Sequence, residues 1–148
     1  MKSIGTITAT LVFTAVMLLV LYARASELRG TVDKVVDGDT LWVCDKRACH
    51  KVRLCGVNAP ERGEAGYHDS KAALADLVTG KVIHCVQVGH GTPCDGRSKP
   101  TSHDRIVAQC FVDNLDIAGA LVAEGHACDW VKFSSGTYSK NAVGMACP

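Results

Sequence analysis

The sequence predicts an α+β domain, mainly β with helices, that closes into a five-stranded barrel. Short apolar runs rich in β-branched residues recur between turn signals, a pattern typical of strands, and they cover residues 28–36, 40–44, 50–57, 81–88 and 105–112. One helical pattern lies between the third and fourth runs, and a second follows the fifth. The resulting order, β-β-β-α-β-β-α, is the connectivity expected of an OB-fold barrel.

The first three strands surround a polar turn and a hairpin. The first run alternates loosely and leads into Asp37-Gly38-Asp39, which is a turn signal. The next two runs are separated only by the short polar link 45–48 and Cys49, so we expect them to pair as a hairpin. Asn58-Ala59-Pro60 ends the third strand, because proline has no N–H to donate to a sheet.

The two helices are predicted from their caps and stops. We expect Asp69 or Ser70 to cap a helix over residues 71–79, which carries its apolar residues on one face and stops at Gly80. Asp116 is expected to cap the second helix, which ends at Gly125. The intervening segment 89–102 contains three Gly and two Pro, and it is predicted to be the least ordered part of the domain.

The N-terminus has the pattern of a signal peptide. Lys2 precedes the apolar stretch 7–22, and Ala23-Arg24-Ala25 then forms a small-residue cleavage site. We therefore expect residues 1–25 to be removed, leaving one domain over residues 26–148 that is exported to the periplasm or secreted. The alternative is an uncleaved anchor, because roughly 20 apolar residues can just span a bilayer; the domain would contact a membrane only in that case.

The charge of the expected mature chain excludes a broadly basic surface. The full chain has 16 Lys and Arg against 15 Asp and Glu, and loss of Lys2 and Arg24 leaves 14 against 15. No basic footprint of the kind found on many nucleic-acid-binding domains is present. Any phosphate binding must therefore come from a local cluster, and non-specific binding should be weak and sensitive to salt.

The eight cysteines predict a disulfide framework. Their number is even and the chain is expected to be exported. Zinc binding is the competing interpretation, which the absence of a C-x-x-C pair disfavours. Two pairings have a structural reason: Cys44 with Cys49 across a hairpin mouth, and Cys85 with Cys110 between neighbouring strands. Cys55, close to Arg53, is the candidate for a free thiol.

The stretch from Val35 to Glu61 contains the residues best suited to chemistry. Asp37, Asp39, Asn58 and Glu61 lie at the ends of its strands, and Arg53 lies inside the third. Carboxylates beside an arginine are the groups that hold a cation and clamp a phosphate. Taken singly, each has a plainer explanation. Asp37-Gly38-Asp39 could be only a turn, and Arg53 could form a structural ion pair with Glu61.

An ordered set of motifs resembles the staphylococcal (micrococcal) nuclease family, also called thermonucleases. The motifs are VVDGDT, VRLCGVNAPE, LVTGK, DRIVAQC and ALVAEGHA, and the similarity runs from about Thr31 to Trp130. The resemblance implies an OB barrel with added helices. It also implies calcium-dependent hydrolysis of phosphodiester bonds in DNA and RNA, with 3′-phosphate products and no sequence specificity.

The same resemblance assigns roles to individual residues. Asp39 corresponds to a direct calcium ligand, and Asn58 occupies the position of a second one. Asp37 and Thr40 are expected to support the ion without binding it directly.

Three further residues match the family's catalytic positions. Arg53 would grip the scissile phosphate, and Glu61 would position or deprotonate the attacking water. Arg105 would stabilise the charge of the transition state and assist the leaving 5′ oxygen.

Several residues depart from the family pattern. The second ligand position is Asn58 rather than an aspartate, which removes one negative charge and should weaken calcium binding. Asp104 precedes Arg105, and an acid there could pair with that arginine and draw it away from the substrate. Candidates for stacking a base are sparse: Trp130, Phe133 and Tyr138 are the only late aromatics, and we expect packing roles for them.

These observations lead to two hypotheses. The first is a monomeric, exported, calcium-dependent endonuclease with a nucleic acid substrate, catalytic Arg53, Glu61 and Arg105, and a metal site at Asp39 and Asn58. The second is a catalytically weakened, nuclease-like OB module of the cell envelope, since OB barrels commonly bind oligomers without catalysing a reaction.

Overall fold

The computed structural model describes residues 27–144 and Cys147, so the predicted leader and its cleavage site lie outside the described residues. Five long strands form the barrel: β1 (Glu27–Val35), β2 (Thr40–Cys44), β3 (Cys49–Leu54), β5 (Val82–Gln87) and β7 (Arg105–Val112). The helices are α2 (Tyr67–Val78), α3 (Ile117–Ala123), α4 (Val131–Ser134) and the 3-10 turn η1 (Ser139–Asn141). Short strands complete the chain: β4 (Val57–Asn58), β6 (Thr101–Ser102), β8 (Leu115–Asp116) and β9 (Cys128–Asp129).

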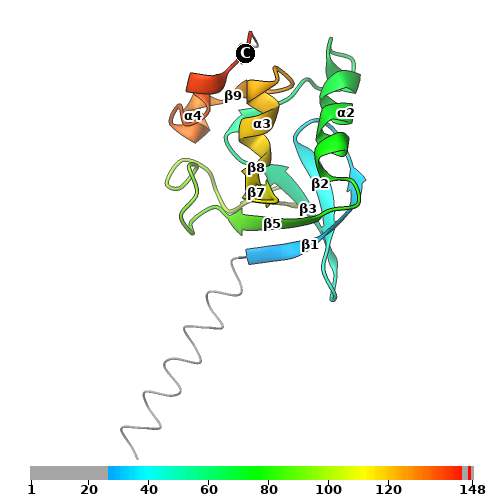
Figure 1. Cartoon of the computed structure of the whole chain (residues 1–148). Coiled ribbons are helices and arrows are strands. Elements are labelled where there is room, and N and C mark those ends of the chain that lie inside the picture. The colour runs from blue at the N-terminus through cyan, green and yellow to red at the C-terminus, as the bar shows by residue number, and fades with distance from the viewer. Residues whose placement is uncertain (1–26, 145–146, 148) are drawn as a thin grey trace, which may run out of the picture.

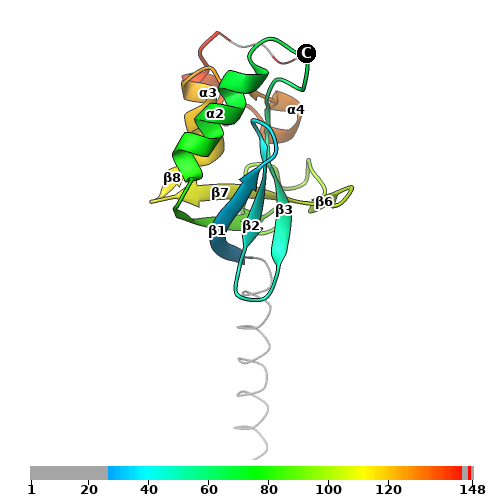
Figure 2. The ribbon, with the colours of Figure 1, turned by 90° about the vertical axis from the view of Figure 1, so that its right-hand side faces the viewer.

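The barrel closes through the pairing of β3 with β7. The sheet runs in the order β3-β2-β1-β5-β7, with antiparallel neighbours along this path, and the parallel β3–β7 pair joins its two ends. Figure 1 shows α2 and α3 on the same side of the barrel, and Figure 2 shows β1, β2 and β3 side by side with α2 above them. The predicted α+β class and five-stranded OB-type barrel are confirmed.

The register of the closing strands brings distant parts of the sequence together. Arg53 pairs with Thr40 on one side and with Val107 on the other. Alternate residues of a strand point to the same face of its sheet, so Arg105 shares a face with Val107, the residue opposite Arg53. The barrel therefore brings the predicted turn at 37–39 and both predicted arginines to one end of β3.

The core lies between the barrel and helices α2 and α3. Its largest fully buried side chains include Leu41, Leu54, Ile83, Leu74 and Leu121, all with 0–1% of their surface exposed. Burial of one such side chain contributes about 1.5–3 kcal/mol. These contacts anchor both strands of the central hairpin and thereby hold the turn and the end of β3 in place.

Helix α2 begins earlier than the predicted capping residues. It starts at Tyr67 after Gly66, whose positive φ of 84° suits glycine, and the Ser70 N–H bonds to the Gly66 carbonyl at 2.9 Å. Ser70 is inside the first turn and fully buried, so it cannot act as the exposed cap. Asp116 does cap α3, and its carboxylate accepts hydrogen bonds from the N–H groups of Ala118 and Gly119.

All eight cysteines are in disulfides. The structure pairs Cys44 with Cys49 and Cys85 with Cys110, the two expected pairs. The other two join Cys55 to Cys94 and Cys128 to Cys147. The expectation of a free thiol at Cys55 is therefore wrong, and no cysteine is left to bind zinc. Within the described part of the chain, none of the helices has the length and apolar character needed to cross a membrane.

Candidate functional site

The turn at residues 37–39 is fixed against helix α2. The N–H groups of Val36 and Asp37 bond to the Thr40 carbonyl at 2.8 and 3.3 Å, and the Asp39 N–H donates to the Asp37 carboxylate at 3.1 Å. A Cβ atom on Gly38 would lie 1.8 Å from the Ser70 hydroxyl oxygen. Only glycine therefore allows the turn to approach the helix this closely, and the approach sets the position of Asp39.

Asp39 and Arg53 form a buried ion pair. Arg53 Nη2 lies 3.0 Å from Asp39 Oδ2, with side-chain exposures of 11% and 4%. The Ala59 N–H donates to the same carboxylate oxygen at 2.9 Å, and the Thr40 hydroxyl donates to the other at 3.0 Å. The partner of Arg53 is thus Asp39, and the alternative of an ion pair with Glu61 is wrong.

The same guanidinium also contacts the second predicted ligand. Arg53 Nη2 donates to the Asn58 side-chain oxygen at 3.4 Å, and Nη1 donates to the Leu54 carbonyl at 2.9 Å. Arg53 therefore connects Asp39 and Asn58, and its orientation is held from three sides.

Burial shapes the charge states of this pair. Burial raises the pKa of Asp39 to about 6, although the Arg53 guanidinium opposes the rise. Burial also lowers the pKa of Arg53, which Asp39 counteracts and the nearby positive charge of Arg105 reinforces. Asp37 and Glu61 act on Arg53 as negative charges as well. The predicted charged residues therefore lie close enough to influence one another.

Arg105 is held only loosely. Its Nε and Nη2 atoms lie 3.5 Å from the carbonyl and hydroxyl oxygens of Ser102, beyond the usual N–H···O range of about 2.7–3.2 Å. Asp104 forms its ion pair with Lys51 at 3.2 Å, which lowers the pKa of that carboxyl. The concern that Asp104 would draw Arg105 away is therefore wrong for this structure.

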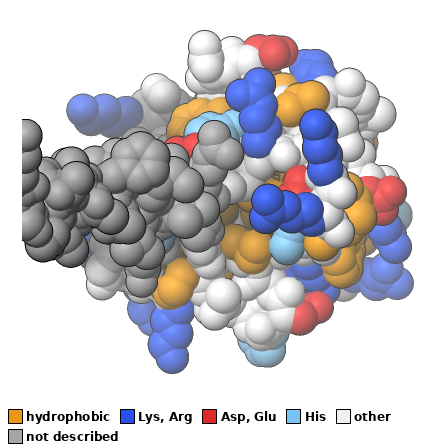
Figure 3. All heavy atoms as spheres, turned by 90° about the horizontal axis from the view of Figure 1, so that it is seen from below, with side chains coloured by type: hydrophobic (Ala, Val, Ile, Leu, Met, Phe, Trp, Pro, Cys, Tyr) orange, Lys and Arg blue, Asp and Glu red, His pale blue; other side chains and the backbone are white. Residues whose placement is uncertain are grey.

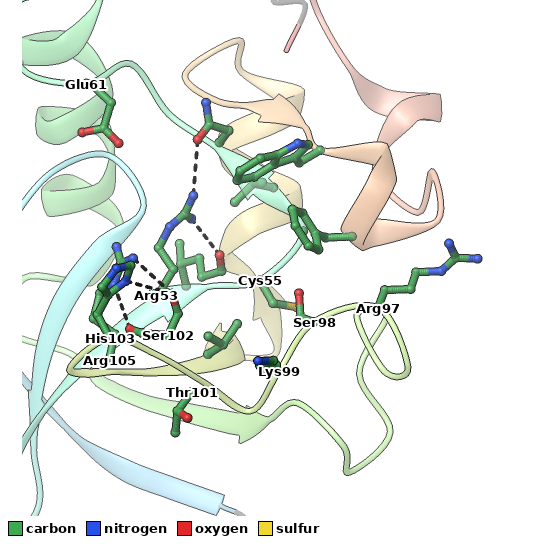
Figure 4. Close-up of a pocket in the computed structure, with 17 residues that line it drawn as sticks. Arg53, Cys55, Glu61, Arg97, Ser98, Lys99, Thr101, Ser102, His103 and Arg105 are labelled. Atoms are coloured by element: carbon green, nitrogen blue, oxygen red, sulfur yellow. Dashed lines mark hydrogen bonds between the residues drawn. The ribbon is translucent and has the colours of Figure 1, made fainter. Parts of the chain in front are cut away.

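Most of the predicted site residues line one pocket with a volume of about 700 Å³. Arg53, Asn58, Glu61 and Arg105 all contribute to its wall, and Figure 4 shows Arg53 between Glu61 and the loop that carries Arg97. Glu61 is exposed, so its carboxylate is accessible to water. Asp39 and Thr40 are buried beneath the wall, behind Arg53. The barrel thus gathers the predicted catalytic residues around one pocket.

Two of the late aromatic residues also line the pocket. Trp130 and Phe133 pack edge to face with ring centres 4.7 Å apart, and both contribute to the wall. Tyr138 is buried in the core, where its hydroxyl donates to Asp116 at 3.1 Å. The expected packing role holds for Tyr138, whereas Trp130 and Phe133 pack against each other and face the pocket as well.

The potential metal ligands near the pocket are oxygen atoms. Asp39, Asp37 and Asn58 offer carboxylate and amide oxygens, the donors that calcium prefers. Among residues 27–144 and Cys147, no three Asp, Glu, His or Cys side chains converge. A divalent cation fits the buried Asp39 carboxylate by charge. It would need the Asn58 amide, backbone carbonyls or water as its further ligands.

The chain is similar to bacterial nucleases over part of its length. No protein-family model matches it. It is 40% identical to "Micrococcal nuclease" of Shigella flexneri over 63 residues, 43% of this chain and 36% of that protein. It is 34% identical over 58 residues to an "Uncharacterized endonuclease" of Escherichia coli, covering 39% of this chain and 38% of that protein. An "Uncharacterized endonuclease" of Haemophilus influenzae is 30% identical over 104 residues, 70% of this chain and 53% of that protein. The chain thus spans about half or less of each of these relatives.

Proposed function

We propose that this chain, a member of the thermonuclease-like family of its relatives, is an endonuclease that hydrolyses phosphodiester bonds in DNA and RNA. The observation that carries the proposal is the convergence of Arg53, Arg105 and Glu61 on one pocket. The names of the relatives support nuclease activity. A diester is an anion that repels hydroxide, so two guanidinium groups beside a carboxylate suit its hydrolysis.

The two arginines have different tasks. Arg53 is oriented by Asp39 and Asn58, so its positive charge is held at a fixed place in the pocket wall, where it attracts the non-bridging oxygens of a bound phosphate. Arg105 makes only loose contacts and can move toward charge that develops in the transition state. Positive charge that meets negative charge as it develops stabilises a transition state more than a ground state.

Glu61 is the group that accepts a proton from water. Water attacks phosphorus and gives its proton to the Glu61 carboxylate, while the bond from phosphorus to the 5′ oxygen breaks. The 5′ oxygen leaves with its bonding electrons, is stabilised by Arg105 and takes a proton from solvent. The products are a 3′-phosphate end and a 5′-hydroxyl end. General-base assistance of this type contributes about 10²–10⁴-fold to a rate.

Calcium is the cofactor that the oxygen ligands suit. Asp39 and Asn58 would hold it, and Asp37 and Thr40 would support it. A bound calcium ion supplies neutralisation of phosphate charge and polarisation of water. Because Asn58 contributes no charge, we expect affinity to be weaker than with two carboxylates, and half-saturation to need millimolar rather than micromolar ion.

The proposed location is outside the cytoplasm. Four disulfides support an oxidising compartment such as the periplasm or the exterior. Export through a cleaved leader over residues 1–25 belongs to this proposal, with membrane attachment only if the leader is kept. The protein is proposed to act as a monomer.

A cleavage assay with matched variants tests the function. Protein expressed from the full chain, with disulfides intact, is incubated with end-labelled single-stranded DNA and RNA in calcium or in EDTA. Glu61→Gln should lower the rate by about 10²–10⁴-fold. Arg62→Gln, at the exposed neighbouring position, should cleave like the wild type. Equal, metal-independent degradation by all three proteins would refute the proposed site.

A binding module without catalysis is the second candidate. The observation in its favour is that Arg53 already contacts both Asp39 and Asn58, the two proposed ligands. Calorimetric titration with calcium separates the two functions. No heat at millimolar ion, together with retained binding of single-stranded DNA, would favour the module. Heat that Asp39→Asn abolishes would favour the nuclease.

A further inference from the structure

One wall of the pocket comes from a loop outside the predicted catalytic residues. Arg97, Ser98 and Lys99 line the pocket, and the two cationic side chains are exposed. In Figure 4, Glu61 and Arg97 lie on opposite sides of Arg53. The loop therefore extends the positive wall of the pocket away from the proposed cleavage point.

A disulfide fixes this loop to the barrel. Cys94, with no exposed surface, is bonded to Cys55, which directly follows β3. Both cysteines pack with Val88 and Val107 in a small hydrophobic cluster separate from the main core. The attachment point is thus two residues from Arg53, so the loop is tied next to the site.

Hydrogen bonds to Asp95 fix the shape of the loop. The Asp95 carboxylate accepts from the N–H groups of Gly89 and Gly91 at 2.7 and 2.8 Å and from the Thr92 hydroxyl at 2.6 Å. At the far end, the Pro100 carbonyl accepts from the Val107 N–H at 3.0 Å. The backbone of the segment expected to be least ordered is therefore held at both ends, which fixes where Arg97 and Lys99 leave the loop.

Positive charge is concentrated at this pocket. Its lining contains four Lys and Arg residues, at 53, 97, 99 and 105, and one acid, Glu61. A second hollow, near the N-terminal end of β1, mixes Glu27 and Asp113 with Arg29 and Lys81. On the face seen in Figure 3, cationic side chains are likewise scattered among acidic and apolar ones. The excess charge at the first pocket thus fits a polyanion there.

We propose that Arg97 and Lys99 form a second phosphate subsite, which binds the backbone of a single-stranded polynucleotide beside the scissile diester. The location of that diester rests on the proposed function. A single strand is the ligand because Arg53, at 11% exposure, can reach a phosphate only if the strand enters the pocket. A duplex is too stiff to bend into the pocket as a flexible single strand can.

Oligonucleotide binding tests the subsite directly. Binding of fluorescent dT12 and of a dT dinucleotide is measured by anisotropy in EDTA, which prevents metal-dependent cleavage. The variant Arg97→Gln/Lys99→Gln should bind dT12 about tenfold more weakly and the dinucleotide less than threefold more weakly. The slope of log affinity against log salt concentration should become shallower by about 1.4, because two phosphate contacts are lost. Over a fourfold rise in salt, the wild type should therefore lose about sevenfold more affinity than the variant. Lys46→Gln/Arg47→Gln, on the exposed hairpin link, makes the same charge change away from the pocket and should bind dT12 like the wild type.

The outcomes separate this proposal from the catalytic one. Equal weakening by both double variants would show a non-specific charge effect and overturn the subsite, as would equal weakening for the dinucleotide and dT12. Selective loss of dT12 binding in a protein that cleaves nothing would support the subsite while refuting the nuclease. If the wild type cleaves and Arg97→Gln/Lys99→Gln binds dT12 as tightly as the wild type, the nuclease would be supported and the subsite refuted.

Discussion

Replacing Arg53 by glutamine should destabilise the fold far more than the same change at Arg105. Arg53 lies 3.0 Å from the Asp39 carboxylate, and both side chains are nearly removed from solvent. Arg105 is partly exposed and has only contacts of 3.5 Å to Ser102. Arg53→Gln leaves the buried Asp39 carboxylate without its cationic partner, whereas Arg105→Gln removes a loosely held side chain.

The size of the effect follows from the burial of Asp39. Breaking a buried pair by removing one partner costs about 3–5 kcal/mol. Thr40 and Ala59 still donate to the carboxylate, and its pKa, already raised to about 6, would rise further, so protonation limits the loss. We therefore expect about 3 kcal/mol for Arg53→Gln, or roughly a 10–15 °C fall in Tm. Arg105→Gln should stay within about 0.5 kcal/mol.

Thermal and urea unfolding followed by circular dichroism, with disulfides intact, measure this difference. The deficit of Arg53→Gln should be larger at pH 8 than at pH 5. The raised pKa of Asp39 means that its neutral form suits the folded state, so its contribution to stability is fully present below its unfolded pKa. That contribution is lost as pH rises through the folded pKa, and the loss is larger when Arg53 is absent. Adding Asp39→Asn should recover part of the loss. Equal Tm values for the two glutamine variants at pH 8 would refute the buried ion pair.

Two further changes probe the turn and the loop. Gly38→Ala should lower the free energy of unfolding by about 1–3 kcal/mol, because its Cβ would lie 1.8 Å from the Ser70 hydroxyl oxygen. The matched control is Gly119→Ala, whose Cβ meets nothing closer than 3.6 Å and which should leave the urea midpoint unchanged or raised. Equal midpoints for the two alanine variants would contradict the tight turn. Burial by itself would raise the pKa of Asp95, but hydrogen bonds from the loop outweigh it and lower that pKa to about 2. Its contribution to stability is present above about pH 4 and is lost as pH falls through about 2. Asp95→Asn should therefore lower Tm at pH 7, with a gap from the wild type that narrows below pH 4; a gap independent of pH would contradict this.

The barrel could be predicted because its signals are local. Strand β7 has the predicted bounds, since a short, mainly apolar run with three β-branched residues lies between two turns. Asp116 is predicted as a helix cap from its residue type and its place before a helical pattern that ends at Gly125, and its side chain makes the expected hydrogen bonds. Cys44 and Cys49 are opposite each other in the hairpin register, so their spacing was sufficient to pair them.

The remaining features depend on contacts between distant residues. The start of α2 is set by Gly66 in a left-handed conformation and by the fit of Ser70 against Gly38, which no capping pattern reveals. The choice of Asp39 over Glu61 as the partner of Arg53 is fixed by the strand register. No motif points to Arg97 and Lys99, the residues of the proposed subsite, because their loop has no regular pattern. The only signal was Cys94, and eight cysteines allow 105 pairings.

The single-turnover cleavage rate of Arg105→Gln is the measurement closest to the proposed chemistry of the pocket. This arginine makes only weak contacts to Ser102, so a loss of rate at unchanged Tm would report its proposed contact with the reacting phosphate. The rate should fall by about 10²–10³-fold on short single-stranded DNA in saturating calcium. Arg105→Lys should restore only part of it, because lysine lacks the planar fork. A rate within threefold of the wild type for Arg105→Gln would contradict the claim that this pocket hydrolyses phosphodiesters.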